Sequence, residues 1–262
     1  MQSLKSGLEV IHFLDKGPRD DFAIVFLNSL GTDFRVWDKL LDVLGDRFRT
    51  VRMDKRGHGL STNYKDDISI ESLAKDVSVL VDSLNLKNIC VVGLSIGGLI
   101  ALELIRQRPN LCNKLILSDT APKIGSENMW AERIKRVQEG GIEAISDDIL
   151  ARWFSNEFLK NKTVELQMWR SMLTRTTKSG YIGCCEAISQ CDLTEQAKLI
   201  NIPTLVIVGD EDGSTPINLV KDGANLIDGS IFKIIKKAGH LPCVEQPNEV
   251  ASIFLQFLEN NT

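Results

Sequence analysis

Residues 89–105 read Ile89-Cys-Val-Val-Gly93-Leu-Ser95-Ile-Gly97-Gly98-Leu-Ile-Ala-Leu-Glu-Leu-Ile105, and this stretch decides the fold. Its first four residues are apolar and mostly β-branched, which predicts a buried strand, whereas residues 99–105 are apolar and favour a helix. Between them, the glycines at positions 93 and 97 permit a turn so sharp that the central serine adopts a strained conformation with an exposed hydroxyl. Because the amino end of a helix favours negative charge, the pattern predicts that Ser95 is a nucleophile at the carboxyl edge of a sheet.

Short apolar runs alternate with helical patterns on both sides of this turn. The other expected strands are residues 8–14, 22–28, 48–53, 114–118, 203–208 and 231–235. Between two of them, Leu73, Val77 and Leu84 recur at helical spacing. Strands that alternate with helices predict an α/β fold with a mostly parallel, doubly wound sheet.

The alternation stops after residue 122. From about residue 123 to 188 the apolar residues recur at helical spacing, with no β-type alternation. We interpret residues 122–191 as a helical cap inserted into a core formed by residues 1–121 and 192–262. The cap is expected over the carboxyl edge of the sheet, where open α/β sheets carry their sites.

A serine hydroxyl is a weak nucleophile at neutral pH and needs a base within hydrogen-bond reach. The chain has three histidines. His12 is expected inside the first strand, and His58 lies in a Gly-flanked turn where a structural role is the simpler interpretation. His240 follows the last strand in a Gly-His-Leu-Pro loop that lets its imidazole reach over the sheet edge. His240 is therefore the predicted base, and His58 is the weaker alternative.

The acid that orients the imidazole is expected between the serine and the histidine in the chain. The loop after the strand 203–208 offers Asp210, Glu211 and Asp212. A Gly-x-x-Asp spacing lets the chain leave the strand before it presents the carboxylate. We therefore expect Asp212 to be the acid, with Asp210 as the alternative.

Two backbone N–H groups are expected to stabilise the oxyanion that forms when Ser95 attacks a carbonyl group. One is the N–H of Ile96, directly after the nucleophile. The other comes from the loop after the strand 22–28, where Leu30 is the leading candidate.

The composition is that of an ordinary globular protein. The 262 residues are 43% hydrophobic and 25% charged, with a formal net charge of -4 and a pI near 5.5. This charge balance argues against nucleic acid as a partner. The chain has neither a run of about 18 apolar residues nor the apolar region of a signal peptide, so we expect a cytoplasmic protein with no membrane partner. The six cysteines match no zinc spacing and are expected to be reduced thiols.

These motifs resemble those of the α/β-hydrolase fold family, and Asp54-x-Arg56-Gly57-His58-Gly59-x-Ser61 is a further shared signature. Within that family the chain resembles the 3-oxoadipate enol-lactonases over nearly its whole length, including the cap. The stretches that carry this resemblance are Asn28-Ser-Leu-Gly-Thr-Asp33, Gly93-Leu-Ser-Ile-Gly-Gly98, Ala121-Pro-Lys-Ile-Gly-Ser126, Arg152-Trp-Phe154 and Gly180-Tyr-Ile-Gly-Cys-Cys-Glu-Ala187. Many members of the fold family have His-Gly where this chain has Asn28-Ser29, but the enol-lactonases share the Asn-Ser pair.

The resemblance implies a serine hydrolase that opens the ring of 3-oxoadipate enol-lactone to give 3-oxoadipate in the β-ketoadipate pathway of aromatic catabolism. It implies an acyl-enzyme and no metal or organic cofactor. Because this small lactone substrate is an anion and the protein is net negative, a local cation is expected to hold its carboxylate. Arg133, one helical turn after Trp130 in the cap, is the leading candidate, and Trp153 is a candidate wall of the pocket. The alternatives are a solvated cap face for Arg133 and a place in the cap core for the two tryptophans.

Two other kinds of function remain open. Another serine hydrolase on the same fold, such as a carboxylesterase, a C–C bond hydrolase or a perhydrolase, would use the same three residues and differ only in its pocket. A ligand receptor with little or no turnover is the alternative outside catalysis, and an intact set of Ser95, Asp212 and His240 argues against it. A haloalkane dehalogenase is excluded because it needs a carboxylate at position 95.

Overall fold

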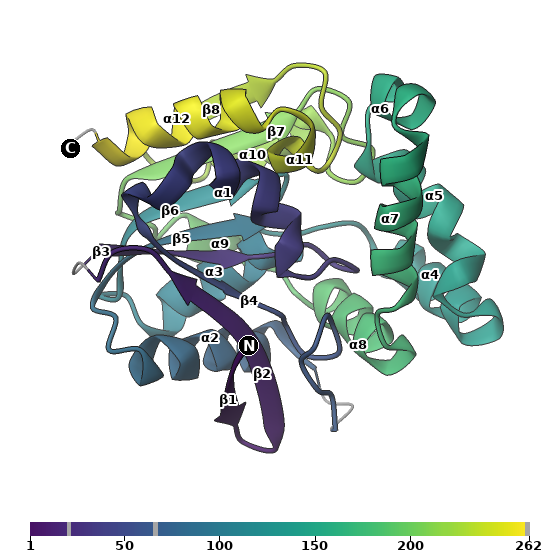
Figure 1. Ribbon diagram of the computed structural model, residues 1–262, viewed down its shortest axis with the longest axis horizontal. Coiled ribbons are helices and arrows are strands. Elements are labelled where there is room, and N and C mark those ends of the chain that lie inside the picture. The colour runs from purple at the N-terminus through teal and green to yellow at the C-terminus, as the bar shows by residue number, and fades with distance from the viewer. Residues whose placement is uncertain (20–21, 65–67, 260–262) are drawn as a thin grey trace.

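The computed structural model describes residues 1–19, 22–64 and 68–259, so residues 20–21, 65–67 and 260–262 of the predicted core lie outside the described part. Within the described part, eight strands form one sheet in the order β1-β2-β4-β3-β5-β6-β7-β8 (Figure 1). The strands are β1 Gln2–Ser6, β2 Glu9–Lys16, β3 Phe22–Leu27, β4 Arg49–Met53, β5 Asn88–Leu94, β6 Cys112–Ser118, β7 Thr204–Gly209 and β8 Ile231–Ile235. The β1–β2 and β2–β4 pairs are antiparallel, and all the other pairs are parallel. The expected α/β class and mostly parallel sheet are therefore confirmed.

The N-terminal strand β1 was not predicted. It forms an antiparallel hairpin with β2 at the edge of the sheet, and only Ser6 of its residues is buried. Such a short, polar edge strand carries no alternation of apolar residues that a sequence pattern could reveal. His12 consequently lies in the second strand and not, as expected, in the first.

Helices cover both faces of the sheet (Figure 1). α1 Asp38–Leu44 packs beside α12 Pro247–Glu259 on one face, and α2 Ile70–Ser83 packs beside α3 Ile96–Gln107 on the other. The shorter elements outside residues 122–191 are the 3-10 turns η1 Phe34–Trp37 and η2 Gly45–Arg47 and the helices α9 Thr194–Ala197, α10 Ile217–Ala224 and α11 Pro242–Glu245. Among the described residues, no helix combines the length and the apolar character that crossing a membrane requires.

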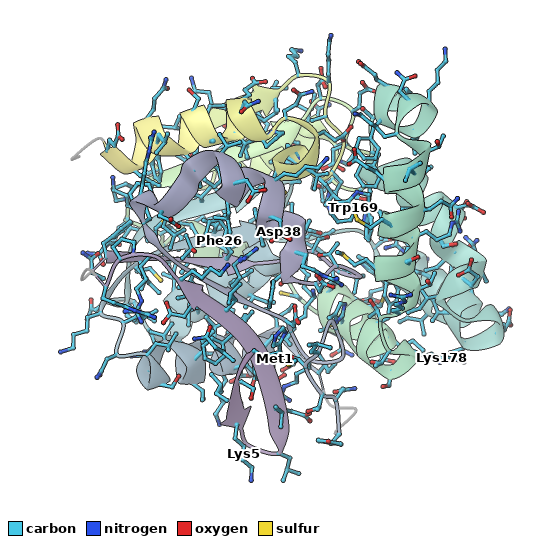
Figure 2. The ribbon with its side chains drawn as sticks, in the orientation of Figure 1. Met1, Lys5, Phe26, Asp38, Trp169 and Lys178 are labelled. Carbon is cyan, nitrogen blue, oxygen red and sulfur yellow. The ribbon has the colours of Figure 1, made fainter. Side chains whose placement is uncertain are left out.

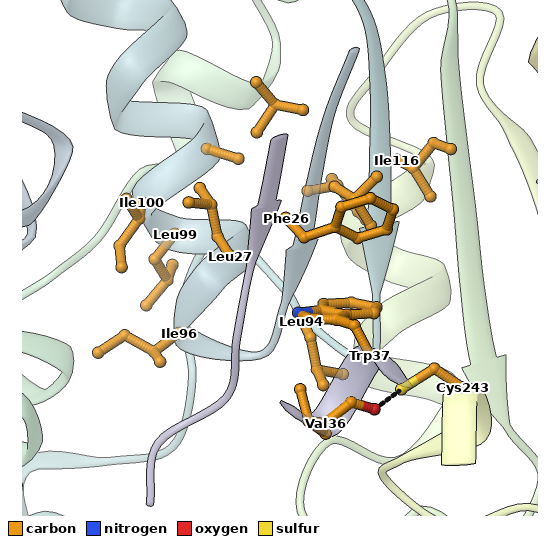
Figure 3. Close-up of a cluster of buried hydrophobic side chains, with 14 of the residues drawn as sticks. Phe26, Leu27, Val36, Trp37, Leu94, Ile96, Leu99, Ile100, Ile116 and Cys243 are labelled. Atoms are coloured by element: carbon orange, nitrogen blue, oxygen red, sulfur yellow. Dashed lines mark hydrogen bonds between the residues drawn. The ribbon is translucent and has the colours of Figure 1, made fainter. Parts of the chain in front are cut away.

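The buried central strand β3 shows how the core fixes the loops above it. Successive side chains of a strand point to opposite faces of the sheet. Phe26 packs against Trp37, with ring centroids 5.0 Å apart, whereas Leu27 lies on the side of α3, near Ile96 and Leu99 (Figure 3). Because side chains pack against both faces of β3, the end of this strand is held in place. This positions the loop at residues 28–33, which follows directly.

Helices α4 to α8 stand together at one side of the sheet (Figure 1). They follow β6 and precede β7: α4 Glu127–Gly140, η3 Ile142–Ile145, α5 Ser146–Trp153, α6 Asn156–Asn161, α7 Thr163–Thr174 and α8 Lys178–Ser189. Trp169 lies on the side of α7 that faces the sheet and is 3% exposed (Figure 2). Thr177 at the start of α8 donates a backbone hydrogen bond to the carbonyl of Gly57, which ties these helices to the core. We propose that residues 122–191, which contain all of these helices, form the cap.

Candidate active site

Ser95 lies at the turn between β5 and α3 with φ +58° and ψ -119°, a strained conformation for a residue other than glycine. A Cβ atom on Gly93 would lie 2.4 Å from the carbonyl oxygen of Gly97, and one on Gly97 would lie 2.1 Å from that of Leu27. Neither position therefore admits a side chain. The two glycines let β3, β5 and α3 approach closely enough to hold the serine in this turn.

His240 and Asp212 form a hydrogen-bonded pair. Nδ1 of His240 lies 3.0 and 2.9 Å from the two carboxylate oxygens of Asp212. An ionised carboxylate only accepts, so Nδ1 carries the hydrogen and Nε2 of the neutral ring keeps a lone pair. His240 is 1% exposed and Asp212 is 8% exposed, so the pair is shielded from water.

The structure distinguishes the two carboxylates considered for this role. Asp210 accepts a hydrogen bond from the backbone N–H of Ala238, and its carboxylate lies 3.6 Å from Nζ of Lys236. Asp212, by contrast, is the one that contacts His240. The Gly-x-x-Asp spacing thus identifies the carboxylate that lies against the imidazole.

Hydrogen bonds from its own loop hold Asp212 in place. The backbone N–H groups of Ser214 and Thr215 donate to Oδ1 at 2.7 and 3.0 Å, and the Thr215 hydroxyl donates to Oδ2 at 2.6 Å. Burial by itself would raise the pKa of Asp212, but His240 and Thr215 outweigh that effect and the pKa is lowered. Asp212 is therefore ionised at neutral pH.

His58 has a structural position. Its Nδ1 donates to the carbonyl of Arg56 at 2.9 Å, and its Nε2 accepts from the N–H of Gly31 at 3.0 Å. Burial, and then the charge of Lys55, lower the pKa of His58 well below its usual value. Both ring nitrogens are engaged, so His58 has no lone pair free to take a proton from a serine.

Two residues beside His58 bond to other parts of the chain. The Arg56 guanidinium donates to Asp76 of α2 at 2.6 and 2.9 Å. Asp54 does bond locally, since it accepts from the N–H of Leu60, but it also accepts from Phe34 and contacts His12. These long-range partners were not visible in the local pattern.

Most of the predicted site residues line one cavity of about 40 Å³ between the sheet and the helices α4, α5 and α8. Its lining residues are Ser29, Leu30, Ser95, Ile124, Met129, Trp130, Arg133, Ile149, Arg152, Trp153, Tyr181, Ile188, Ser214, Thr215 and His240. Asp212 lies behind His240 and outside the lining. Ile96 is also outside it, but its N–H is the first of α3, directly after Ser95. Within the described part of the chain, the N–H groups of Leu30 and Ile96 have no hydrogen-bond acceptor.

Two guanidinium groups reach this cavity from the cap. The Arg133 guanidinium carbon lies 4.6 Å from the centre of the Trp130 ring, and its charge acts on the buried side chain of Tyr181. Trp130 is held by a hydrogen bond of 2.7 Å from its Nε1 to the carbonyl of Ile124. Neither Arg133 nor Arg152 forms an ion pair with another described residue. Arg152 and Tyr181 were not predicted to line the site, although both belong to stretches that carry the family resemblance.

The comparison with known proteins agrees with this architecture. A family model described as the alpha/beta hydrolase fold matches residues 23–247. The chain belongs to the α/β-hydrolase fold family.

Similar proteins of this family are enol-lactonases. The hydrolase is 32% identical over 239 residues to 3-oxoadipate enol-lactonase 2 of Acinetobacter baylyi (strain ATCC 33305 / BD413 / ADP1), which covers 90% of this chain and 88% of that relative. It is 34% identical over 248 residues to 3-oxoadipate enol-lactonase 1 of the same strain, with 93% and 91% covered. The solved structure of the enol-lactonase from Burkholderia xenovorans LB400 superposes with a TM-score of 0.93 at 32% identity and covers 99% of this chain and 100% of that chain. The chain is thus an ester-hydrolysing enzyme, and its resemblance to the enol-lactonases is confirmed.

A second buried carboxylate of this hydrolase, Asp119, lies beside the Asp212–His240 pair. It follows β6 with φ +50° and accepts hydrogen bonds from the N–H of Gly209 at 2.8 Å and the hydroxyl of Ser118 at 2.6 Å. One side-chain atom each of Asp119, Asp212 and His240 lie within 4.8 Å of one another. Burial, and then the charge of Asp212, raise the pKa of Asp119 well above its usual value. Burial and the charge of Asp212 therefore both favour the protonated form of Asp119.

Asp119→Asn is expected to stabilise the hydrolase relative to wild type, by a margin that grows as the pH rises from 5 to 7. In the unfolded chain Asp119 ionises near pH 4. In the folded protein burial and the charge of Asp212 favour its protonated form, so wild type loses stability with rising pH until the folded pKa is passed. Asparagine removes this loss, which is at most about 1.4 kcal/mol per pH unit for one proton. Its amide resembles the protonated acid, and asparagine tolerates a positive φ. Chemical denaturation of both proteins at several pH values measures the margin.

The matched control is Asp192→Asn, because hydrogen bonds from Thr194 and Lys123 lower the pKa of Asp192 to about 2. Asp192 is ionised in both the folded and the unfolded chain between pH 5 and 7, so its substitution should change stability by an amount that does not vary over that range. A margin for Asp119→Asn that stays equally constant would contradict the protonated state of Asp119.

Proposed function

We propose that this hydrolase opens the ring of 3-oxoadipate enol-lactone to give 3-oxoadipate, and that it serves the β-ketoadipate pathway of aromatic catabolism. The main support is the cavity that Ser95 and His240 line together with Arg133 and Arg152. An enol-lactone with a carboxymethyl group has an ester carbonyl for the serine and a carboxylate for the guanidinium groups. The names of the enol-lactonases similar to this chain support the same substrate.

The reaction begins when Oγ of Ser95 attacks the lactone carbonyl carbon while Nε2 of His240 takes the hydroxyl proton. Asp212 holds the ring in the tautomer that leaves Nε2 free and stabilises the imidazolium that forms. The N–H groups of Ile96 and Leu30 donate to the oxyanion of the tetrahedral intermediate. Each group acts from a fixed position, so little reorganisation accompanies the attack.

Collapse of the intermediate breaks the ring C–O bond and leaves an acyl-enzyme on Ser95. The ring oxygen departs as an enol, after His240 returns the proton, and the enol tautomerises to a ketone. This tautomerisation removes the species that could close the ring again. Water then attacks the acyl carbonyl with His240 as the base, and 3-oxoadipate is released. The scheme needs no metal or organic cofactor.

The cap supplies the binding site for the substrate carboxylate in this proposal. Arg133 stacks on Trp130, and this contact orients its guanidinium group before substrate binds. Arg152 brings a second positive charge, and Trp153 forms a wall. Because the cavity of about 40 Å³ is far smaller than a ligand pocket of several hundred Å³, cap side chains must move to admit the lactone.

The test of this proposal compares two substrates with the same enzyme. Loss of ultraviolet absorbance by 3-oxoadipate enol-lactone measures the proposed reaction, and p-nitrophenyl acetate measures simple ester hydrolysis. We expect kcat/KM for the lactone to exceed that for the ester by at least about 100-fold, the effect of one or two charged contacts. If the ester is cleaved and the lactone is not, the substrate is wrong although the hydrolase assignment stands.

Arg133→Ala is expected to lower kcat/KM for the lactone by about 10- to 100-fold, mainly through KM, because a charge-assisted hydrogen bond contributes about 1.5–3 kcal/mol. Arg152→Ala should act in the same direction. Hydrolysis of the neutral p-nitrophenyl acetate should change by less than about 3-fold, since that ester has no carboxylate to bind. The control is Lys135→Ala, on the same helix, with a side chain that is 73% exposed. Equal losses on both substrates would show that the arginines maintain the cap rather than bind the carboxylate.

A further inference from the structure

Lys55 is a buried lysine that the mechanism above does not use. It follows β4 and is 4% exposed, although lysine is almost never buried without an acidic partner. No described carboxylate forms an ion pair with it. Its Nζ instead donates to the carbonyl of Ser29 at 2.6 Å and to that of Thr32 at 3.3 Å. Both carbonyls belong to the loop that carries Leu30.

The peptide unit between Ser29 and Leu30 links this lysine to the cavity. In a planar trans peptide, the C=O and N–H groups point in opposite directions. Lys55 donates a hydrogen bond to the C=O of Ser29. Leu30 lines the cavity together with Ser95, whereas Lys55 does not line it. The N–H of Leu30 is therefore directed away from Lys55.

The rest of the loop is equally constrained. The carbonyl of Ser29 also accepts from the N–H and the hydroxyl of Thr32, at 3.2 and 2.9 Å. The next N–H along the chain, that of Gly31, donates to His58. The N–H of Leu30 thus lies between two engaged peptide groups in a loop whose orientation is fixed from several sides.

We propose that Lys55 is a positioning residue for the oxyanion site: its ammonium group holds and polarises the Ser29–Leu30 peptide, so that the N–H of Leu30 is a stronger and better-aimed donor to the oxyanion. A positive charge at the carbonyl oxygen withdraws electron density from the peptide, and hydrogen-bonded groups in a low-dielectric interior polarise one another. The inference rests on the proposed roles of Ser95 and Leu30.

The surroundings of Lys55 make this effect dependent on pH. Burial lowers the pKa of Lys55 to about 8, while Cys184, Asp54 and Asp33 favour its charged form and limit the decrease. Burial also raises the pKa of the Cys184 thiol to about 11. His58, which burial keeps neutral, also acts on Lys55, and the side chains of Leu73, Val77 and Ile100 from α2 and α3 line a small pocket together with it. Above about pH 8 the lysine becomes a neutral amine, which still donates a hydrogen bond but no longer polarises the peptide.

The experiment measures kcat and KM from pH 6 to 10 for wild type, Lys55→Met and Lys55→Gln, with both p-nitrophenyl acetate and 3-oxoadipate enol-lactone. We expect kcat of wild type to fall above about pH 8. Lys55→Met should lower kcat at pH 7 by about 10- to 100-fold with little change in KM, somewhat less than the loss of an oxyanion donor itself. Lys55→Gln keeps a donor without the charge, so its kcat should be intermediate. Neither variant should show the decrease near pH 8.

The control is Lys5→Met, the same change at an exposed position on β1 (Figure 2), which should leave kcat and the pH profile unchanged. Labelling with a fluorophosphonate separates the two hypotheses. No labelling of Ser95 in wild type would overturn the proposed function. Labelling with an unchanged kcat in Lys55→Met, or a decrease near pH 8 that persists in either variant, would overturn the role of Lys55 alone. If Lys55→Met does not fold, Lys55→Gln and the wild-type profile decide the question.

Discussion

Ser95→Ala is expected to lower kcat for 3-oxoadipate enol-lactone by about 10⁵- to 10⁶-fold, the cost of removing the nucleophile from a comparable catalytic set. The substitution removes one oxygen atom at a position that is 8% exposed, from a residue that lines the same cavity as His240. Substrate binding should change little, because the proposed contacts to the carboxylate come from Arg133 and Arg152 and not from Ser95. The residual rate reflects the oxyanion donors and binding alone.

Two measurements check this expectation. The loss of ultraviolet absorbance gives kcat for both proteins, and mass spectrometry after fluorophosphonate treatment should find one modified serine, Ser95, in wild type and none in the variant. Heat-denatured wild type is the control for nonspecific labelling, and thermal unfolding shows that the variant is folded. A residual activity above about 1% of wild type would mean that another group attacks the lactone.

The fold was largely predictable because its strongest signals are local. Residues 89–105 contain a complete strand, turn and helix, and the observed elements β5 and α3 follow that pattern. The buried parallel strands are continuous apolar runs, which are readily recognised in a sequence. The pattern failed at β1, where pairing with β2 and not burial of an apolar face makes the strand.

The arrangement of the site was partly predictable because each residue follows a strand of the parallel sheet. The carboxyl ends of parallel strands meet at one edge, so the loops that carry Ser95, Asp212 and His240 were expected to converge. Lys55 and Asp119 could not be found in the same way. Lys55 lies in a run of charged residues, Asp54-Lys-Arg56, which is typical of an exposed turn, and its burial results from packing against the loop at residues 28–33. The raised pKa of Asp119 depends on its burial and on the proximity of Asp212, which lies 93 residues further along the chain.

A replacement of Asp212 tests its proposed role in orienting His240. Asp212→Asn is expected to lower kcat at pH 7 by about 10⁴-fold with little change in KM. The backbone N–H groups of Ser214 and Thr215 both donate to Oδ1, so the amide oxygen of the asparagine is expected at that position. Its NH2 group then takes the position of Oδ2, from which it can donate to Nδ1 of His240. The imidazole then carries its hydrogen on Nε2, where it cannot accept the proton of Ser95. The loss therefore arises from the wrong tautomer rather than from a missing contact with substrate.

The matched control is Asp210→Asn, in the same loop, because Asp210 contacts Ala238 and Lys236 but not His240. Its kcat should stay within about 3-fold of wild type, as for a surface substitution away from the site. Steady-state kinetics with p-nitrophenyl acetate and with the lactone should rank the two variants in the same order, because the tautomer of His240 matters for any ester. A larger loss in Asp210→Asn would transfer the role of the acid to Asp210. A small loss in both variants would mean that another group can orient the imidazole of His240. Asp119 lies close to the ring, so the double variant Asp212→Asn/Asp119→Asn would then lose the remaining activity.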